Sequence, residues 1–265
     1  MTAGLRTHAA LHVADGEATL RDEAVIEETP VALLYNGLPL AVMMATPTDL
    51  EDFALGFALS EGIVEDAGEF TLVDIVRSKR GVALHAAIPQ RCFDALEGRG
   101  RNLEGRSGCG LCGVESLEAA VRPLPRIEAA GPRLATARIH AGLAALARRQ
   151  SLNAQCGGAH AAGFILDDHA VVREDVGRHN AVDKVIGALH RASPRIDAGS
   201  GFLAVTSRAS YEIVAKAARA RIAVVAALSA PTDLAIRQAE AAHLTLIAFA
   251  RDGRMNVYAG RERIV

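Results

Sequence analysis

From residue 202 to residue 250 the sequence alternates short apolar runs with amphipathic stretches, and this alternation limits the fold more than any other feature. Buried strands are predicted at 202–206, 222–227 and 244–250, with shorter ones at 164–166 and 171–173. Helices are predicted at 138–150, 180–191, 211–220 and 232–241. Strands separated by helices of this length imply parallel pairing, with the helices packed on the faces of the sheet.

The first part of the chain predicts a mixture of hairpins and a helix. Residues 31–45 are typical of a β-hairpin, because Asn36-Gly37 suits a two-residue turn and Pro39 suits a position near the turn or on an edge strand. The spacing of Thr48 and Glu51 matches a capping box that opens a helix ending at Gly62. Two further strands are predicted at 70–77 and 82–88. The expected class is therefore α/β, or α+β for the whole chain.

Regular patterns stop between residues 91 and 132. This segment mixes arginines, acids and glycines and then becomes rich in proline, which predicts a long functional loop followed by a linker. We expect an N-terminal tail at 1–24, an α+β region at 25–132 that carries a flexible loop, and a C-terminal α/β domain at 133–265.

Composition narrows the function classes. The chain has 265 residues and a formal net charge of −2, which disfavours a general nucleic-acid binder. Its amino-terminal residues lack a signal-peptide core, and no apolar run is long enough to span a membrane. The four cysteines do not form a disulfide framework, so we expect a protein of the reducing cytoplasm.

The pair Cys109-x-x-Cys112 lies among glycines in the irregular segment, with Arg101 and Arg106 nearby. Two thiols at this spacing can hold half of a zinc site, form a redox disulfide or carry a persulfide. A second pair of ligands is absent around Cys92 and Cys156, and a strand-to-helix context is absent around the pair. These absences favour a persulfide carrier, in which one thiolate accepts sulfur and the second thiol helps to release it.

His160 follows Gly157-Gly158 and is either a buried, hydrogen-bonded histidine or part of a site. A zinc deaminase needs a glutamate two residues after its histidine and a later pair of cysteines. Ala162 occupies the position of that glutamate, so deamination is disfavoured.

Two strand-to-helix junctions have polar sequences that suit an anion. The first contains Arg178 and His179, and the second contains Ser207, Arg208 and Ser210. The alternatives are structural, namely a salt-bridged loop with Asn180 as helix cap and a serine that only caps the second helix.

The run in which the last long strand ends predicts a hairpin tip. Its residues are Phe249, Ala250, Arg251, Asp252, Gly253 and Arg254. The two arginines on either side of a D-G turn could bind a nucleotide phosphate or form a solvated surface.

Together these segments resemble the formate dehydrogenase accessory sulfurtransferase family, FdhD. The matching residues are Cys109-x-x-Cys112-Gly113, Gly157-Gly158-x-His160, the run 173–184, Thr206-Ser207-Arg208-x-Ser210-x-Glu212, Phe249-x-Arg251 and Asn256-Val257-Tyr258. A further match is Asp52-Phe53-x-Leu55-Gly56-Phe57 with Ser60-Glu61-Gly62, so the resemblance covers the chain from about residue 25.

The resemblance implies a sulfur carrier that is required for formate dehydrogenase activity. Such a protein takes sulfur from a cysteine desulfurase and gives it to a molybdenum or tungsten bis-pyranopterin guanine dinucleotide cofactor, which GDP would mimic. Cys109 matches the persulfide cysteine of the family, Cys112 its companion, and 249–254 the cofactor segment. The family also implies a cytidine-deaminase-like C-terminal domain and a homodimer.

A rival interpretation is a non-catalytic chaperone of the cofactor, in which Cys109 and Cys112 are structural and hold zinc. This alternative predicts protected thiols and nearly one metal ion per chain.

Overall fold

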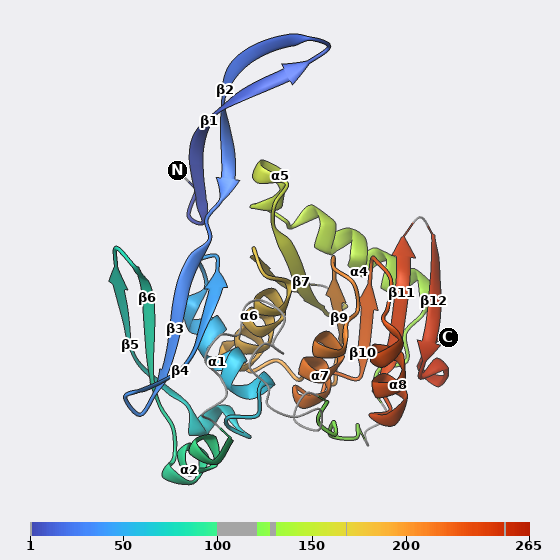
Figure 1. Cartoon of the computed structure of the whole chain (residues 1–265). Coiled ribbons are helices and arrows are strands. Elements are labelled where there is room, and N and C mark those ends of the chain that lie inside the picture. The colour runs from blue at the N-terminus through green and yellow to red at the C-terminus, as the bar shows by residue number, and fades with distance from the viewer. Residues whose placement is uncertain (1, 100–120, 128–130, 168, 252) are drawn as a thin grey trace.

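The structure is a computed structural model and describes residues 2–99, 121–127, 131–167, 169–251 and 253–265 (Figure 1). Cys109, Cys112 and Asp252 lie outside these residues. The expected loop at 91–132 is wrong for its first part, where α2 forms a helix (Gln90–Arg99). Cys92 and Leu96 are buried one helical turn apart, which gives α2 an apolar side despite the charged sequence around it.

A six-stranded sheet has the order β12-β11-β10-β9-β7-β8. Its strands are β7 (His160–Ile165), β8 (Ala170–Asp175), β9 (Phe202–Val205), β10 (Val224–Ala227), β11 (Thr245–Arg251) and β12 (Arg254–Ala259). Parallel pairing is confirmed for β9, β10 and β11. It is wrong for β7, which runs antiparallel to both β8 and β9, because a short turn instead of a helix joins β7 to β8.

Helices cover both faces of this sheet (Figure 1). They are α4 (Thr136–Arg148), α6 (Arg178–Arg191), α7 (Tyr211–Arg219) and α8 (Asp233–Ala241), with the single turns α5 (Asn153–Cys156) and η2 (Arg261–Arg263). Helices α6, α7 and α8 pack side by side on one face, whereas α4 contacts β7, β8, β9 and β11 from the other. Strands β9 and β10 are buried along their whole lengths, which explains their continuous apolar sequences.

A second, four-stranded sheet has the order β4-β3-β6-β5. Its strands are β3 (Thr29–Tyr35), β4 (Leu38–Ala45), β5 (Thr71–Ser78) and β6 (Gly81–Ala87). The hairpin with Asn36-Gly37 at its turn is confirmed, and Pro39 lies on the edge strand β4 next to that turn. Helix α1 (Leu50–Ser60) packs between this sheet and α6, and the turn η1 (Ala67–Glu69) precedes β5.

The capping box expected at Thr48 is wrong. Helix α1 has Asp49 as its N-cap, with φ 50° and no side-chain cap. Thr48 lies 3.4 Å from the ammonium group of Lys184, which donates to its hydroxyl. A contact with a residue far along the chain therefore replaces the local cap.

An arm of two strands projects from the molecule (Figure 1). It consists of β1 (Leu5–Ala14) and β2 (Glu17–Ile26), joined at Asp15-Gly16 with φ angles of 51° and 84°. Residues 5–14 and 17–24, within the tail expected at 1–24, form most of it. The D-G dipeptide between two alternating sequences is the signal that predicts such a hairpin.

The α/β class is confirmed, whereas the division into domains and the deaminase-like assignment remain predictions. No helix in the described part of the chain is long and apolar enough to cross a membrane.

Candidate functional site

One edge of the six-stranded sheet collects the ends of four strands. Because β8 and β9 are both antiparallel to β7, they run in the same direction, and β10 and β11 continue this direction. The carboxyl ends of β8, β9, β10 and β11 therefore share one edge, where β7 begins at His160. Both predicted anion junctions lie at this edge, as ligand sites of open α/β sheets commonly do.

The first junction leads from β8 into α6. The helix begins at Arg178, with Gly177 as its N-cap, so Asn180 lies inside the first turn and the expected Asn180 cap is wrong. The side-chain amide of Asn180 instead donates to Asp175 Oδ1 at 3.0 Å and to the backbone oxygen of Met44 at 2.8 Å. The N–H groups of the first turn of α6, which have no acceptor within the helix itself, thus lie beside Arg178 and His179.

The second junction leads from β9 into α7. Ser207 Oγ donates to the backbone oxygen of Arg208 at 3.0 Å, and Ser210 is the N-cap position of α7 but makes no side-chain cap. Neither serine therefore caps the helix through its side chain. Ser210 Oγ is buried and has no hydrogen-bond partner within the described residues. The second junction thus contains a buried hydroxyl group that makes no hydrogen bond to the described residues.

The two junctions are in contact. His179 Nε2 of α6 lies 3.8 Å from Glu212 Oε2 in the first turn of α7. Arg178 Nε is buried without a partner among the described residues. Two helix starts, a guanidinium group and an imidazole thus gather in one place, which suits a phosphate or pyrophosphate.

His160 lies between the junctions, at the start of β7 and opposite Asp175 in the strand register. Burial and the charge of Arg178 lower the pKa of His160, although Asp175 opposes them. The imidazole is therefore neutral near pH 7. The backbone N–H of the next residue, Ala161, donates to Thr206 Oγ1 at 3.0 Å, which ties β7 to the second junction.

The carboxyl end of β11, which contains Phe249, Ala250 and Arg251, lies further along the same edge. Phe249 has φ 52° and is 39% exposed, and its N–H donates to the backbone oxygen of Ser229 at 3.1 Å. The next residue, Ala250, is fully buried. Ser229 belongs to the loop after β10, and the neighbouring Ala230 accepts from the N–H of Ala209 at 3.1 Å. Phe249 therefore belongs to the same group of loops as Ser207, Arg208 and Ser210.

The predicted hairpin tip is confirmed. Arg251 and Arg254 are partners in the β11–β12 register, both are exposed, and Gly253 has φ 74°. A positive φ at this position favours glycine. Asp252, the remaining residue of the predicted segment, is outside the described residues.

The thiols of Cys109 and Cys112 are also outside the described residues, so their place relative to this edge remains a prediction. Cys92 is buried and Cys156 is half-buried, and both are free thiols. Within the described part of the chain, no three His, Cys, Asp or Glu side chains are grouped as a metal site would require.

Two residues of the run 173–184 form buried contacts that stabilise the fold. Lys184 and Asp175 form a fully buried ion pair at 2.7 Å, and Lys184 also donates to the backbone oxygen of Thr46 at 2.9 Å. Asp175 accepts in addition from the N–H groups of Thr46 and Gly177, at 3.0 and 2.7 Å. These contacts fix the connection between β4 and α1 against the start of α6, and so they support the first junction.

A second buried cluster escaped the sequence analysis. Lys216 of α7 bonds Asp183 of α6 at 2.8 Å, and it also contacts Ser60 and Glu61 at the end of α1. Burial raises the pKa of Asp183 to about 6, although Lys216 opposes this effect. The cluster joins the two helices whose first turns form the anion-suited edge. Spacing could not reveal it, because its members are far apart in the sequence.

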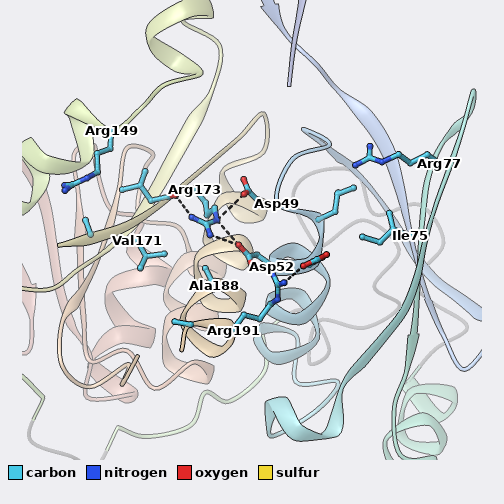
Figure 2. A pocket seen from close by; sticks show the side chains of 14 residues that line it. Asp49, Asp52, Ile75, Arg77, Arg149, Val171, Arg173, Ala188 and Arg191 are labelled. Carbon is cyan, nitrogen blue, oxygen red and sulfur yellow. Dashed lines mark hydrogen bonds and ion pairs between the residues drawn. The ribbon is translucent and has the colours of Figure 1, made fainter. Parts of the chain in front are cut away.

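A cleft of about 980 Å³ lies elsewhere, between β5, the start of α1, β8 and the end of α6 (Figure 2). Arg173 and Arg191 on its floor both bond Asp52, at 2.8 and 2.6 Å. Arg77 and Arg149 lie on opposite walls (Figure 2). None of the predicted site residues lines this cleft, so it is separate from the anion-suited edge.

Comparison with known proteins identifies close relatives. A sequence model of the FdhD/NarQ family matches residues 26–265. The sulfur carrier protein FdhD of Xanthomonas axonopodis pv. citri (strain 306) is 53% identical over 255 residues, which covers 96% of this chain and 89% of that protein. The protein of the same name from Cupriavidus necator is 50% identical over 251 residues, covering 94% of this chain and 86% of the relative.

A solved structure also matches. The crystal structure of a protein from Desulfotalea psychrophila, described as a formate dehydrogenase accessory protein, superposes with a TM-score of 0.76 at 26% identity. The match covers 98% of this chain and 99% of that one.

Proposed function

The chain belongs to the FdhD/NarQ family, and from this membership we propose that it is a sulfur carrier that serves formate dehydrogenase. The observation that carries the proposal is the identity of 50–53%, over nearly the whole chain, to proteins named as sulfur carriers. The matched accessory protein of known structure supports formate dehydrogenase as the client.

We further propose that the sulfur comes from a cysteine desulfurase. The thiolate of Cys109 attacks the outer sulfur of the desulfurase persulfide, which forms a sulfur–sulfur bond on Cys109 and releases the desulfurase thiolate. Attack by the thiolate of Cys112 on the inner sulfur of Cys109 then releases hydrosulfide and leaves a disulfide between the two cysteines. A dithiol reductant returns both cysteines to thiols for the next cycle.

The acceptor in this proposal is the bis-pyranopterin guanine dinucleotide cofactor of molybdenum or tungsten, which is the substrate of the transfer. Its phosphates would lie at the starts of α6 and α7, near Arg178, His179 and Arg208, with Phe249–Arg254 beside them. What supports this position is that two helix N-termini lie at one edge together with Arg178 Nε and Ser210 Oγ, which have no hydrogen-bond partner among the described residues. We also propose that the chain acts as a homodimer.

Mass spectrometry tests the carrier role. Incubation with desulfurase and cysteine should add about 32 Da, one sulfur atom, to the wild-type chain and nothing to Cys109→Ala. Cys92→Ala is the matched control and should still gain the sulfur. An unchanged adduct in Cys109→Ala would refute the assignment, and one bound zinc per chain with no adduct would favour the structural chaperone instead.

GDP binding tests the acceptor edge separately. Arg208→Ala should weaken GDP binding about tenfold or more, because a charge-assisted bond to phosphate contributes roughly 1.5–3 kcal/mol. Arg80→Ala, in the turn between β5 and β6, removes the same charge far from the edge and should bind GDP like the wild type. Equal affinity in all three proteins would exclude a phosphate role for Arg208.

A further inference from the structure

The arm of β1 and β2 has one mainly apolar and one mainly polar face. Asp22, opposite Ala9, is the charged residue on the mainly apolar face, and Val25 lies on the other face. The strand register places Leu11 opposite Leu20 and Val13 opposite Ala18 on one face, and His12 opposite Thr19 on the other. Leu11 and Val13 are each 62% exposed, and Leu20 is 78% exposed. The arm thus presents an apolar ribbon to water, which is unfavourable in proportion to its area.

The arm has little support from the other described residues of its own chain. Helix α5 packs on β2 near the base of the arm, where Leu5 is buried. Beyond that base the arm extends away from both sheets (Figure 1). A two-stranded ribbon without further packing is marginally stable in water. Packing of its apolar face against another surface would therefore stabilise the arm.

The same chain has a second uncovered apolar surface, the outer face of its four-stranded sheet. Val42, Ala32, Ala83 and Val76 form a row in register across all four strands. Val42 is 53% exposed, Val76 is 44% exposed, and Met44 beside the row is 41% exposed. The opposite, inner face of this sheet is buried against α1.

We propose that each arm lies with its apolar face on the outer face of the four-stranded sheet of a second copy. Because the ribbon and the sheet face belong to one chain, a two-fold axis covers both surfaces in both copies. The inference names the contact surface of the homodimer proposed above and does not depend on the sulfur chemistry.

The area available is sufficient for a specific interface. Each strand of the arm has 10 residues. The base, with the pair Leu5–Ile26 and the pair next to it, is already packed, which leaves about 8 residues of each strand. At about 3.3 Å per residue and a width of about 10 Å for two strands, the free part of the apolar face covers roughly 260 Å². Two arms and the two faces they cover would then bury roughly 1,000 Å², the area that a specific protein interface needs at least.

The test is the mass of the full-length chain in solution, measured by light scattering. The wild type should have twice the chain mass of 27.8 kDa. Leu20→Glu on the ribbon and Val42→Glu on the sheet face should each give monomers at the same concentration, because a carboxylate is costly to bury in an apolar contact. Thr19→Glu adds the same charge to the polar face of the arm and should remain a dimer.

Three results would overturn the proposal: a monomeric wild type, a dimeric Leu20→Glu, or a dimeric Val42→Glu beside a monomeric Leu20→Glu. The last result would mean that the arm covers some other surface. Circular dichroism identifies any variant that fails to fold, and Leu11→Ser then serves as a milder change on the same face, with a weaker dimer expected. The sulfur adduct on Cys109 is measured independently, so failure of the interface and failure of the carrier role can be distinguished.

Discussion

Some residues of the run 173–184 lie at the candidate site, whereas others form buried contacts that stabilise the fold. Arg178 and His179 lie at the sheet edge, where an anion would bind. Asp175, Asp183 and Lys184 are buried and bind residues of the β4–α1 connection, α1 and α7. The sequence shows that this run is polar, but it cannot show which side chains are buried, because their partners lie up to 138 positions away.

Lys184 should be essential for stability. Lys184→Met keeps the length of the side chain but leaves the buried carboxylate of Asp175 without its cation. Removal of one partner of a buried ion pair costs roughly 3–5 kcal/mol in the free energy of unfolding. Urea unfolding followed by circular dichroism measures this loss.

The matched control is Arg237→Met, which breaks the exposed ion pair between Arg237 and Asp233 on α8. An exposed pair contributes roughly 0–1 kcal/mol, so this variant should unfold almost like the wild type. Similar losses of unfolding free energy in the two variants would show that the buried Asp175–Lys184 pair stabilises the fold no more than an exposed pair does.

At the scale of elements, local patterns predicted most helices and strands correctly. Alternation and helical periodicity are properties of consecutive residues, so they identified β3 to β6, α1, α4 and the strands and helices after residue 200. The two strands of the arm, helix α2 and the direction of β7 were missed or misjudged, for different reasons. The arm has exposed strands, α2 has only a narrow apolar side, and the direction of β7 depends on a turn.

The crossing of α1 and α6 depends on two glycines that no local pattern distinguishes. A Cβ atom on Gly187 would lie 1.9 Å from the backbone oxygen of Asp52, and one on Gly56 would lie 1.7 Å from that of Asp183. The two helix backbones therefore approach so closely that any side chain at these positions would push them apart. This crossing joins the four-stranded sheet to the site-bearing half of the chain.

Gly187→Ala should therefore destabilise the protein. Alanine in a helix is normally better than glycine by about 1 kcal/mol, so propensity alone predicts a gain in stability. Overpacking against a fixed backbone should outweigh this gain and cost roughly 1–3 kcal/mol net. Chemical unfolding gives the sign directly.

Gly199→Ala provides the comparison, because a Cβ atom there meets only the side chain of Asp197, at 3.4 Å or more. Its stability should change by less than about 0.5 kcal/mol. A Gly187→Ala protein more stable than the wild type would contradict the close approach of α1 and α6.

At the scale of the whole molecule, the candidate edge arises from the strand order. His160, Arg178, Ser207 and Phe249 are far apart in the sequence, and they share one edge because β8, β9, β10 and β11 end on the same side of the sheet. The sequence analysis predicted polar junctions in a common sheet, and this arrangement is confirmed. Periodicity cannot predict that β7 lies between β8 and β9 and runs antiparallel to both. This position of β7 brings His160 between the two junctions.

A second large cavity, of about 890 Å³, lies at the other ends of α6 and α7. His190 of α6 lines it together with Arg195. Burial and the nearby charge of Arg195 lower the pKa of His190 to about 4, although Asp66 opposes them. The folded protein therefore resists protonation of this imidazole more than the unfolded chain does.

The pH dependence follows from this difference. Between about pH 6.5 and about pH 4 the unfolded chain binds more protons at His190 than the folded protein does, so stability rises with pH in this window. The contribution of His190 is complete above about pH 6.5 and is lost as the pH falls towards 4. His190→Gln removes this titration, so its melting temperature should fall less than that of the wild type between about pH 7 and about pH 5.

Thermal unfolding at the two pH values measures the effect, and the comparison uses the difference within each protein, so that a general loss of stability in the variant cancels. A difference of a few degrees is expected, because 1 kcal/mol corresponds to about 2–4 °C in a chain of this size. His12→Gln makes the same substitution on the exposed arm and should behave like the wild type. If His190→Gln loses as many degrees as the wild type, then acid destabilisation comes from other groups and the cavity at the ends of α6 and α7 takes no part in it.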